Sequence, residues 1–322
     1  MKHNVIMNNI KEILQIIANM FVVYGYHVEN NGLVNGKAGI MLYLYRYAQY
    51  AENEHYQDYA NDMLDGMMRI APSLPFDFEN GLAGVGWMVG RLLNDDLLEG
   101  EPDVVLPSID KIVFNHMECN PAISLLGSSL YFVERFKHDS QSSYMVDCIN
   151  KIFLFITKGI ENYKGTFSLY HINSILYFLG MVCGQFVSHK NICRILQLIT
   201  SLLKRIFDER VYDVTDVIIY HQVVDVLKRK MSDYVNLLDY LPMEDYLETK
   251  LEVSQFIRIA CQQLLYFDKI TIPFPSDYSI YNFVDDKQQN IQMSDFVING
   301  GLAGLGLSLL EKMKCDEIEK TR

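Results

Sequence analysis

The sequence is poor in the residues that mark secreted, multidomain or nucleic-acid-binding proteins. Lysine and arginine are outnumbered by aspartate and glutamate, 28 to 40, so the chain lacks the basic surface that a nucleic acid requires. The six cysteines are scattered without a CxxC pair, which argues against a disulfide framework and against a zinc site of that kind. Only eight prolines occur, and no linker stands out. We therefore predict a single domain over residues 1–322 and no nucleic-acid partner.

Long apolar runs are also missing. The first ten residues lack the apolar core of a signal peptide, and no stretch approaches the roughly 18 apolar residues of a membrane span. We expect a cytoplasmic protein without membrane insertion. At the same time 50% of the residues are hydrophobic and 21% are charged, which excludes a disordered chain and predicts a large buried core.

A short phrase is repeated along the chain. Asn-Gly-x-Ala-Gly occurs at 35–39 and 80–84, Gly-Gly-x-Ala-Gly occurs at 300–304, and weaker versions begin at Ser124 and Ser168. Successive starts up to Ser168 are roughly 44 residues apart, and the last gap is close to three such intervals, which indicates an internal repeat. Glycine costs a helix interior about 1 kcal/mol relative to alanine. We therefore expect these glycines to allow close approach, either to a neighbouring helix or to something bound at the helix start.

Apolar residues recur at helical spacing, and no segment alternates with a period of two. The helix expected over 37–50 is apolar nearly all round and that over 54–70 has one apolar stripe, which is typical of a buried inner helix and an outer partner. Helical spacing places six side chains in core or rim packing: Tyr43, Tyr45, Tyr47, Met63, Met67 and Met68. The predicted helices comprise residues 4–20, 37–50, 54–70, 81–93, 102–117, 142–163, 168–179, 191–207, 217–230 and 247–267, and residues 268–296 are expected to be loop. We predict an all-α toroid of six to seven helical hairpins whose inner-helix N-termini point their N–H groups into a shared cavity.

The repeated stretches resemble the lanthionine synthetase C-like (LanC-like) family. The matching segments are 36–45, 56–60, 80–87, 125–132 and 301–306; the resemblance covers about 30–185 and 295–312, and residues 208–294 diverge. It implies an α/α toroid with a central cavity. In active members a zinc ion binds a peptide cysteine as thiolate, and this thiolate adds to a dehydrated serine or threonine to close a thioether ring.

The zinc ligands of that family lie in a Trp-Cys-x-Gly phrase and a Cys-His-Gly phrase, and this chain has neither. Its one tryptophan, Trp87, is followed by Met88, and no Cys-His dipeptide occurs. We therefore expect no cofactor and no zinc-dependent cyclisation. Whether a distant set such as Cys261 with His221 forms another metal site is left open.

Two catalytic residues follow from the resemblance alone. His171 stands where relatives carry a Leu-Ala-His-Gly phrase, which implies an acid/base role, although a histidine that caps an inner helix or is hydrogen bonded in the core is the alternative. Asp77 corresponds to an aspartate ahead of a glycine phrase in the family, and a simple loop or helix-start carboxylate is its alternative.

The predicted function is a LanC-like protein associated with the maturation of thioether-bridged peptides, without cyclase activity, and with a precursor peptide or a peptide-modifying enzyme as partner. Two alternatives stay open. One is a carbohydrate-active hydrolase on the same scaffold, with Asp77 and Glu79 or Asp285 and Asp286 as its carboxylate pair. The other is a non-catalytic peptide-binding or scaffold subunit of a modification complex.

Overall fold

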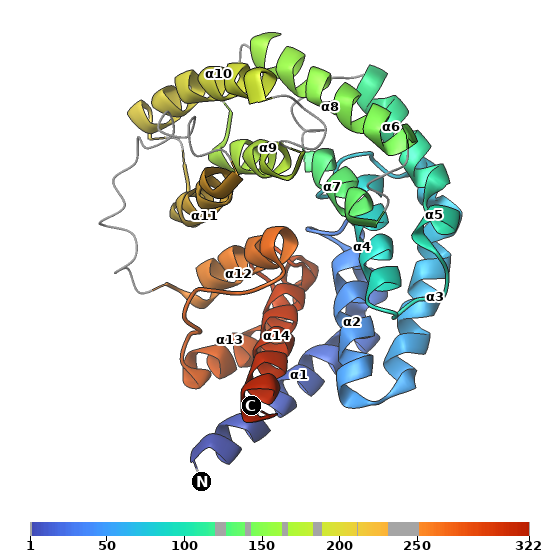
Figure 1. Ribbon diagram of the computed structural model, residues 1–322. Coiled ribbons are helices and arrows are strands. Elements are labelled where there is room, and N and C mark those ends of the chain that lie inside the picture. Colours follow the sequence, from blue (N-terminus) through green and yellow to red (C-terminus); the bar gives the residue numbers. More distant parts are fainter. Residues whose placement is uncertain are drawn as a thin grey trace. The chain divides into compact units, whose positions relative to one another are not determined.

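The computed structural model describes residues 2–119, 127–138, 143–162, 167–182, 189–210, 212–230 and 251–321. These ranges are built from helices and contain no strand (Figure 1). The predicted all-α class is therefore confirmed. In the same part of the chain, no helix is both long and apolar enough to cross a membrane.

The chain forms two compact units. Unit 1 comprises Met1–Pro75, Glu79–Glu99 and Lys250–Arg322, and unit 2 comprises Phe76–Phe78 and Gly100–Thr249. The helices of unit 1 are α1 (Lys2–Tyr24), η1 (Gly25–His27), α2 (Lys37–Ala51), α3 (Glu54–Ile70), η2 (Ala71–Ser73), α4 (Leu82–Asn94), α12 (Val253–Phe267), α13 (Asp277–Gln289), η5 (Met293–Phe296) and α14 (Leu302–Thr321). Those of unit 2 are α5 (Pro102–Val105), α6 (Pro107–Cys119), α7 (Ser129–His138), α8 (Ser143–Asn162), α9 (Leu169–Val182), α10 (His189–Asp208) and α11 (Val214–Lys230). The single domain stays a prediction.

Unit 1 has two rows of helices. The inner row runs α12, α14, α2 and α4, each packed on the next, and the outer row runs α13, α1 and α3. The rows meet where α12 packs on α13, α14 on α1 and α2 on α3. Helix α2 is buried from Ala38 through Tyr45 without a break, whereas α3 buries only Ala60, Met63 and Met67. The predicted inner and outer helices over 37–70 are thus confirmed.

Aromatic rings fill the space between the two rows. Tyr43, Tyr45 and Tyr47 are buried, as expected from their spacing. Phe21 of α1 meets Tyr43 edge-on at a centroid distance of 5.4 Å and Phe296 of η5 at 5.5 Å. The Tyr43 hydroxyl donates to the Leu14 carbonyl oxygen at 2.6 Å, so its polar end is satisfied inside the core.

Unit 2 repeats the two-layer arrangement. Helices α7, α9 and α11 pack side by side in one layer, and α6, α8 and α10 form the other (Figure 1). The layers are joined where α7 packs on α8 and α9 on α10. Helix α9 is buried on nearly all sides, and α10 buries one stripe composed of Ile192, Ile195, Leu196, Ile199, Leu203 and Ile206. The sequence pattern of buried and one-sided helices therefore holds here too.

Two predicted segments are wrong. The single helix expected over 102–117 is interrupted at Leu106, because Pro107 has no N–H to continue the first helix and begins a second one. The segment 268–296, expected to be loop, contains α13 and η5. Helix α13 is not predicted from periodicity, because it buries only Ile280 and Val284. Ser276, which caps its start, was the signal available in the sequence.

The glycine phrases mark helix starts at which the preceding loop folds back on the helix. The N–H of Lys37 donates to the Asn30 carbonyl at 2.9 Å, and the N–H of Leu82, its counterpart in the second copy, donates to the Pro75 carbonyl at 2.7 Å. A β-carbon at Gly39 would lie 2.6 Å from the Leu33 carbonyl oxygen, six residues earlier. Glycine at these positions therefore lets the backbone of the preceding loop pack directly against the helix start.

The loops ahead of α14, α2 and α4 are also joined to one another. Ile298 and Asn299 both donate their N–H groups to the Val34 carbonyl, and in turn Val34 and Asn35 both donate to the Glu79 carbonyl. The phrase asparagines reinforce the second junction, because the Asn35 side-chain amide donates to the Asn80 side-chain oxygen at 3.0 Å. Three copies of the phrase thus lie in equivalent places along the inner row of unit 1.

Candidate functional site

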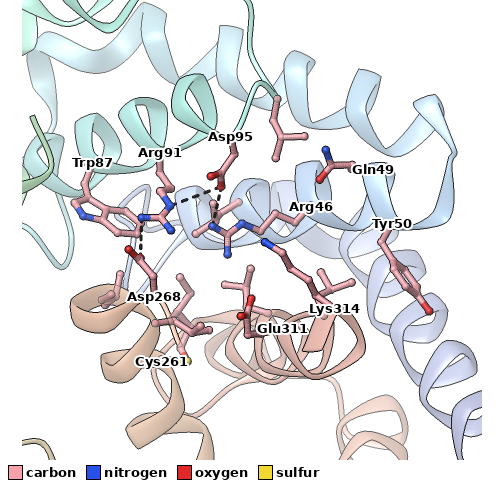
Figure 2. A pocket seen from close by; sticks show the side chains of 17 residues that line it. Arg46, Gln49, Tyr50, Trp87, Arg91, Asp95, Cys261, Asp268, Glu311 and Lys314 are labelled. Atoms are coloured by element: carbon pink, nitrogen blue, oxygen red, sulfur yellow. Dashed lines mark hydrogen bonds and ion pairs between the residues drawn. The ribbon is translucent and has the colours of Figure 1, made fainter. Parts of the chain in front are cut away.

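A pocket in unit 1 is lined mainly by residues in the middle and C-terminal parts of the inner helices, and by Ile298 ahead of the third phrase. It has a volume of about 590 Å³, within the range of small-molecule sites. Figure 2 shows side chains from α2, α4, α12 and α14 converging on it. Its lining residues are Leu42, Arg46, Gln49, Tyr50, Trp87, Arg91, Asp95, Leu97, Cys261, Leu264, Leu265, Asp268, Ile298, Leu307, Leu310, Glu311 and Lys314. The sequence predicts a cavity lined by the backbone N–H groups of the inner-helix N-termini. This pocket is different, because the N–H groups of Lys37 and Leu82 donate to loop carbonyls instead.

The lining follows the sequence repeat. Leu42, Trp87 and Leu307 each come six residues after the second residue of a phrase, Gly36, Gly81 or Gly301. The residues ten positions after the same glycines are Arg46, Arg91 and Glu311, and all three also face the pocket. Equivalent positions of three repeats therefore meet in one cavity, which gives it an apolar floor and a charged rim.

A chain of ion pairs crosses the rim of the pocket. Arg46 of α2 lies 3.0 Å from Asp95 at the end of α4, and Arg91 of α4 lies 2.7 Å from Asp268 at the end of α12 (Figure 2). Arg91 also approaches Asp95 at 3.6 Å. The carboxylates keep about a third or more of their surface in water, at 35% and 41% exposure, so each pair contributes roughly 1 kcal/mol or less to stability. The pairs hold the charges at fixed places around the cavity.

Two further charges on the rim have no ion-pair partner in the described part of the chain. Glu311 and Lys314 are one turn apart on α14, and both line the pocket. The contact described for Glu311 is a distant one, 3.9 Å from the Cys315 sulfur. Figure 2 shows the Lys314 ammonium extending over the cavity toward Arg46. An acceptor and a donor are thus available to a bound molecule.

Cys261 is the only thiol on the pocket wall, and it is a structural one. Its Sγ donates to the Ile298 carbonyl at 3.3 Å, and burial raises the pKa of the thiol far above its usual value. The thiol therefore stays protonated, which suits neither a nucleophile nor a metal ligand.

The zinc implied by the LanC-like resemblance does not fit the side chains described. Across the described ranges, no group of three or more histidine, cysteine, aspartate or glutamate side chains is placed to hold a metal ion. Cys261 belongs to unit 1 and His221 to unit 2, and the Nε2 atom of His221 is buried without a described hydrogen bond. Cys183 lies outside the described residues, so the absence of a metal site stays a prediction.

The two residues predicted from the resemblance lie in unit 2 and not at this pocket. His171 is in the first turn of α9, where Ser168 caps the helix. The Ser168 hydroxyl accepts from the His171 backbone N–H at 3.4 Å and meets the ring Nδ1 at 2.6 Å. Burial lowers the pKa of His171, which favours the neutral ring. Asp77 is a half-buried residue in the bend before the second phrase. The catalytic role of both residues stays a prediction; Ser168 and not His171 is the capping residue, and the His171 ring is hydrogen bonded to it.

The carboxylate pairs considered for a hydrolase are not on the pocket wall either. Asp285 and Asp286 lie on the outer helix α13, where Asp285 accepts from Gln289 at 2.8 Å and Asp286 from Asn290 at 3.3 Å. Asp77 and Glu79 belong to different units. Neither pair lines the cavity described for unit 1.

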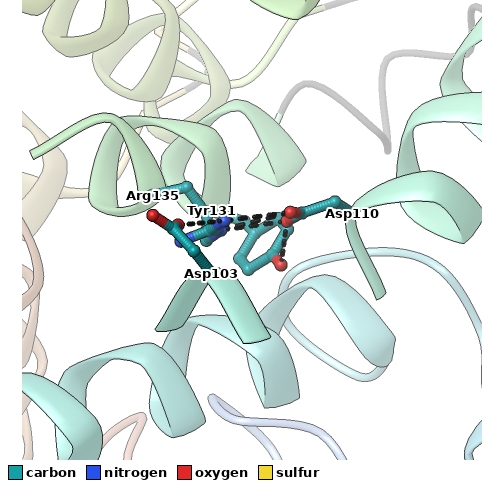
Figure 3. A network of polar contacts seen from close by, with 4 residues as sticks. All are labelled: Asp103, Asp110, Tyr131 and Arg135. Carbon is teal, nitrogen blue, oxygen red and sulfur yellow. Dashed lines mark hydrogen bonds and ion pairs between the residues drawn. The ribbon is translucent and has the colours of Figure 1, made fainter. Parts of the chain in front are cut away.

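Unit 2 contains a second charged cluster, centred on the buried side chains of Asp110 and Arg135. Arg135 of α7 donates from Nε to Asp110 Oδ1 and from Nη2 to Asp110 Oδ2, both at 3.1 Å, and reaches Asp103 of α5 at 3.0 Å (Figure 3). The Tyr131 hydroxyl donates to the same Asp110 carboxylate. Burial, followed by the Asp110 charge, raises the pKa of Tyr131 well above its usual value. The cluster ties α5, α6 and α7 together.

The chain matches no protein-family model, no curated protein and no solved structure in comparisons with each. The LanC-like resemblance consequently stays a prediction that depends on the repeated phrases themselves.

Proposed function

We propose that this chain is a peptide-binding protein of the LanC-like kind, with an α/α-toroid fold and without zinc-dependent cyclase activity. The observation that carries the proposal is the pocket built from equivalent positions of three repeats. Its apolar floor suits aliphatic side chains, and its rim offers hydrogen-bond donors and acceptors of both charges. A peptide combines these features, because its side chains are apolar while its backbone and ends are polar.

Three further features support the architecture and the lack of cyclase activity. The loops before α14, α2 and α4 are joined by the same type of hydrogen bond, as expected of neighbouring repeats. Helix α14 packs on α2 within the inner row and on α1 of the outer row, so helices far apart in the sequence are neighbours in unit 1. The sequence also contains neither zinc-ligand phrase of the family. In this proposal the chain holds a peptide for a partner that performs the modification.

The single tryptophan makes peptide binding directly measurable. Trp87 lines the pocket and is only 4% exposed, so the intrinsic tryptophan fluorescence of the full chain reports on this site alone. We expect the peptide Leu-Leu, added to the purified full chain, to shift the Trp87 emission in a saturable manner. A flat titration, together with the absence of binding heat in calorimetry, contradicts the proposal.

Matched leucine variants locate the binding. Leu265→Gln changes a half-buried residue of the pocket wall and should weaken binding at least severalfold, because it removes apolar contact area. Leu154→Gln changes a leucine on α8 that is 54% exposed and should leave binding unchanged. Equal affinities of the two variants would place the peptide elsewhere.

Metal analysis and gene context test the rest of the proposal. The purified chain should contain no tightly held zinc, and one zinc per chain with cyclase activity on a dehydrated peptide would overturn the non-catalytic assignment. A dehydratase gene and a short Ser/Thr/Cys-rich precursor gene are expected nearby. Their absence would remove the link to thioether peptides while leaving peptide binding intact.

A further inference from the structure

The charges that line the pocket add up to zero. Three cations, Arg46, Arg91 and Lys314, face three anions, Asp95, Asp268 and Glu311. A ligand with a large net charge would therefore be repelled by one set as strongly as it is attracted by the other. A ligand that carries one charge of each sign, suitably placed, is favoured by both sets.

The ion pairs leave one charge of each sign available. Asp95 and Asp268 are each paired with an arginine, whereas Glu311 and Lys314 have no ion-pair partner in the described part of the chain. The aliphatic wall continues from these two residues along the same helix through Leu310 and Leu307. A molecule seated against that wall thus meets an acceptor and a donor at its edge.

The spacing of Glu311 and Lys314 along α14, together with the volume of the cavity, favours a short ligand. Residues three apart on a helix have β-carbons about 5–6 Å apart, which sets the scale on which one molecule can contact both side chains. An extended dipeptide spans about 7 Å between its ends, and a tetrapeptide spans about 14 Å. The dipeptide matches the pair, and the cavity of about 590 Å³ is large enough for its two side chains.

We infer that the pocket recognises short peptides with both ends free, with the terminal ammonium at Glu311, the terminal carboxylate at Lys314 and aliphatic side chains on the leucine wall. This inference rests on the proposed function and narrows its ligand to the products of peptide-bond hydrolysis. Arg46 and Arg91 are already paired with Asp95 and Asp268, so Glu311 and Lys314 are the charges that this inference assigns to the ligand ends.

Four forms of one dipeptide separate the contributions of the two ends. Leu-Leu carries both charges, N-acetyl-Leu-Leu carries only the carboxylate, Leu-Leu-amide carries only the ammonium, and N-acetyl-Leu-Leu-amide carries neither. Titrations of the full chain, followed by Trp87 fluorescence and calorimetry, should give the tightest binding for Leu-Leu. Each blocked end should cost about three- to tenfold in affinity, as expected for a charged hydrogen bond at a partly exposed site.

Variants of the two rim residues identify which end binds where. Glu311→Gln should weaken Leu-Leu and Leu-Leu-amide while leaving N-acetyl-Leu-Leu unchanged, and Lys314→Met should weaken only the peptides with a free carboxylate. Such cycles isolate each contact from general effects on folding. Lys312→Met and Asp316→Asn, on the same helix but outside the pocket lining, are the matched controls and should leave all four affinities unchanged.

The possible outcomes distinguish this inference from the proposed function. Equal binding of all four peptides to the wild-type chain overturns recognition of the ends and leaves peptide binding standing. Tighter binding of Leu-Leu-Leu-Leu than of Leu-Leu overturns the length limit in the same way. No response to any leucine peptide overturns both the inference and the proposed function.

Discussion

The charged groups of the two units differ mainly in how much water reaches them. In unit 1 the arginines of the pocket pair with Asp95 and Asp268, which are 35% and 41% exposed. In unit 2 Arg135 and Asp110 are 4% and 2% exposed, and their contacts are bidentate. Exposed pairs contribute little to stability and leave charges accessible to a ligand, whereas a buried pair makes each partner necessary to the other. The same side-chain chemistry therefore forms a partly exposed pocket rim in unit 1 and a buried structural clamp in unit 2.

The largest effect that tests this comparison is expected at Asp110. Asp110→Ala leaves Arg135 buried without its main partner and should lower the free energy of unfolding by about 3–5 kcal/mol. Asp95→Ala, its matched change in unit 1, should cost roughly 1 kcal/mol or less. Urea unfolding followed by circular dichroism measures both changes. Similar losses in the two variants would remove the distinction between rim and clamp.

The second effect contrasts a tightly packed glycine at the start of α14 with an open one on α3. In Gly304→Ala the new β-carbon would collide with the Ile298 carbonyl oxygen and lie 2.6 Å from the Cys261 sulfur, so we expect a loss of about 1–3 kcal/mol from overpacking. Gly66→Ala, on the exposed side of α3 with nothing within 4 Å, should raise stability by about 0.5–1 kcal/mol. A gain in the free energy of unfolding at both sites would show that a methyl group fits at Gly304 without overpacking.

A smaller effect concerns the pocket arginines. Arg91→Gln removes the 2.7 Å contact with Asp268 and the 3.6 Å contact with Asp95. Because these carboxylates are exposed, the loss of unfolding free energy should be about 1 kcal/mol or less and should shrink at high salt. Thermal unfolding at low and high ionic strength checks this dependence. A salt-independent loss would place Arg91 with Arg135 among the buried clamps.

The smallest expected effect is a pH dependence at His171. Burial lowers the pKa of this ring in the folded chain, so the unfolded chain binds a proton more readily. Above the unfolded pKa of about 6.5 the ring is neutral in both states and stability is unaffected; stability falls as the pH drops from there to the lower pKa of the folded chain. His171→Asn should flatten that part of a pH series of urea unfolding curves. The pKa of His221 is also lowered by burial, so His221 should continue to contribute to the pH dependence of the unfolding free energy in this variant.

Most helices could be predicted because their apolar residues are periodic. Helix α3 begins and ends where expected, since Asn53 accepts from the His55 N–H at its start and the last residue of its buried stripe, Met67, lies one turn before its end. Helix α13 could not be found in the same way, because two buried residues do not make a period. Pro107 indicates the break between α5 and α6, but the apolar spacing on both sides of it predicts one continuous helix.

The pocket was missed for a different reason. The family resemblance points to His171 and Asp77, whereas Arg46, Arg91 and Glu311 share a repeat position that is readable from the phrases alone. An arginine inside an otherwise apolar inner helix was the available signal. Cys261 and Asp268 could not be found this way, because α12 has no glycine phrase and reaches the pocket only through tertiary packing with α14.

The folded-back loops also restrict where the chain can change in length. At Gly36 and Gly301 an added β-carbon would meet the carbonyl of the residue six positions earlier, Asn30 and Asp295, so both loops have the same length to the residue. One inserted residue in either loop would move a carbonyl off its helix start and detach that loop from the next one. Homologous chains are therefore expected to vary in length between the hairpins. The number of residues from Asn30 to Gly36 and from Asp295 to Gly301 should stay constant.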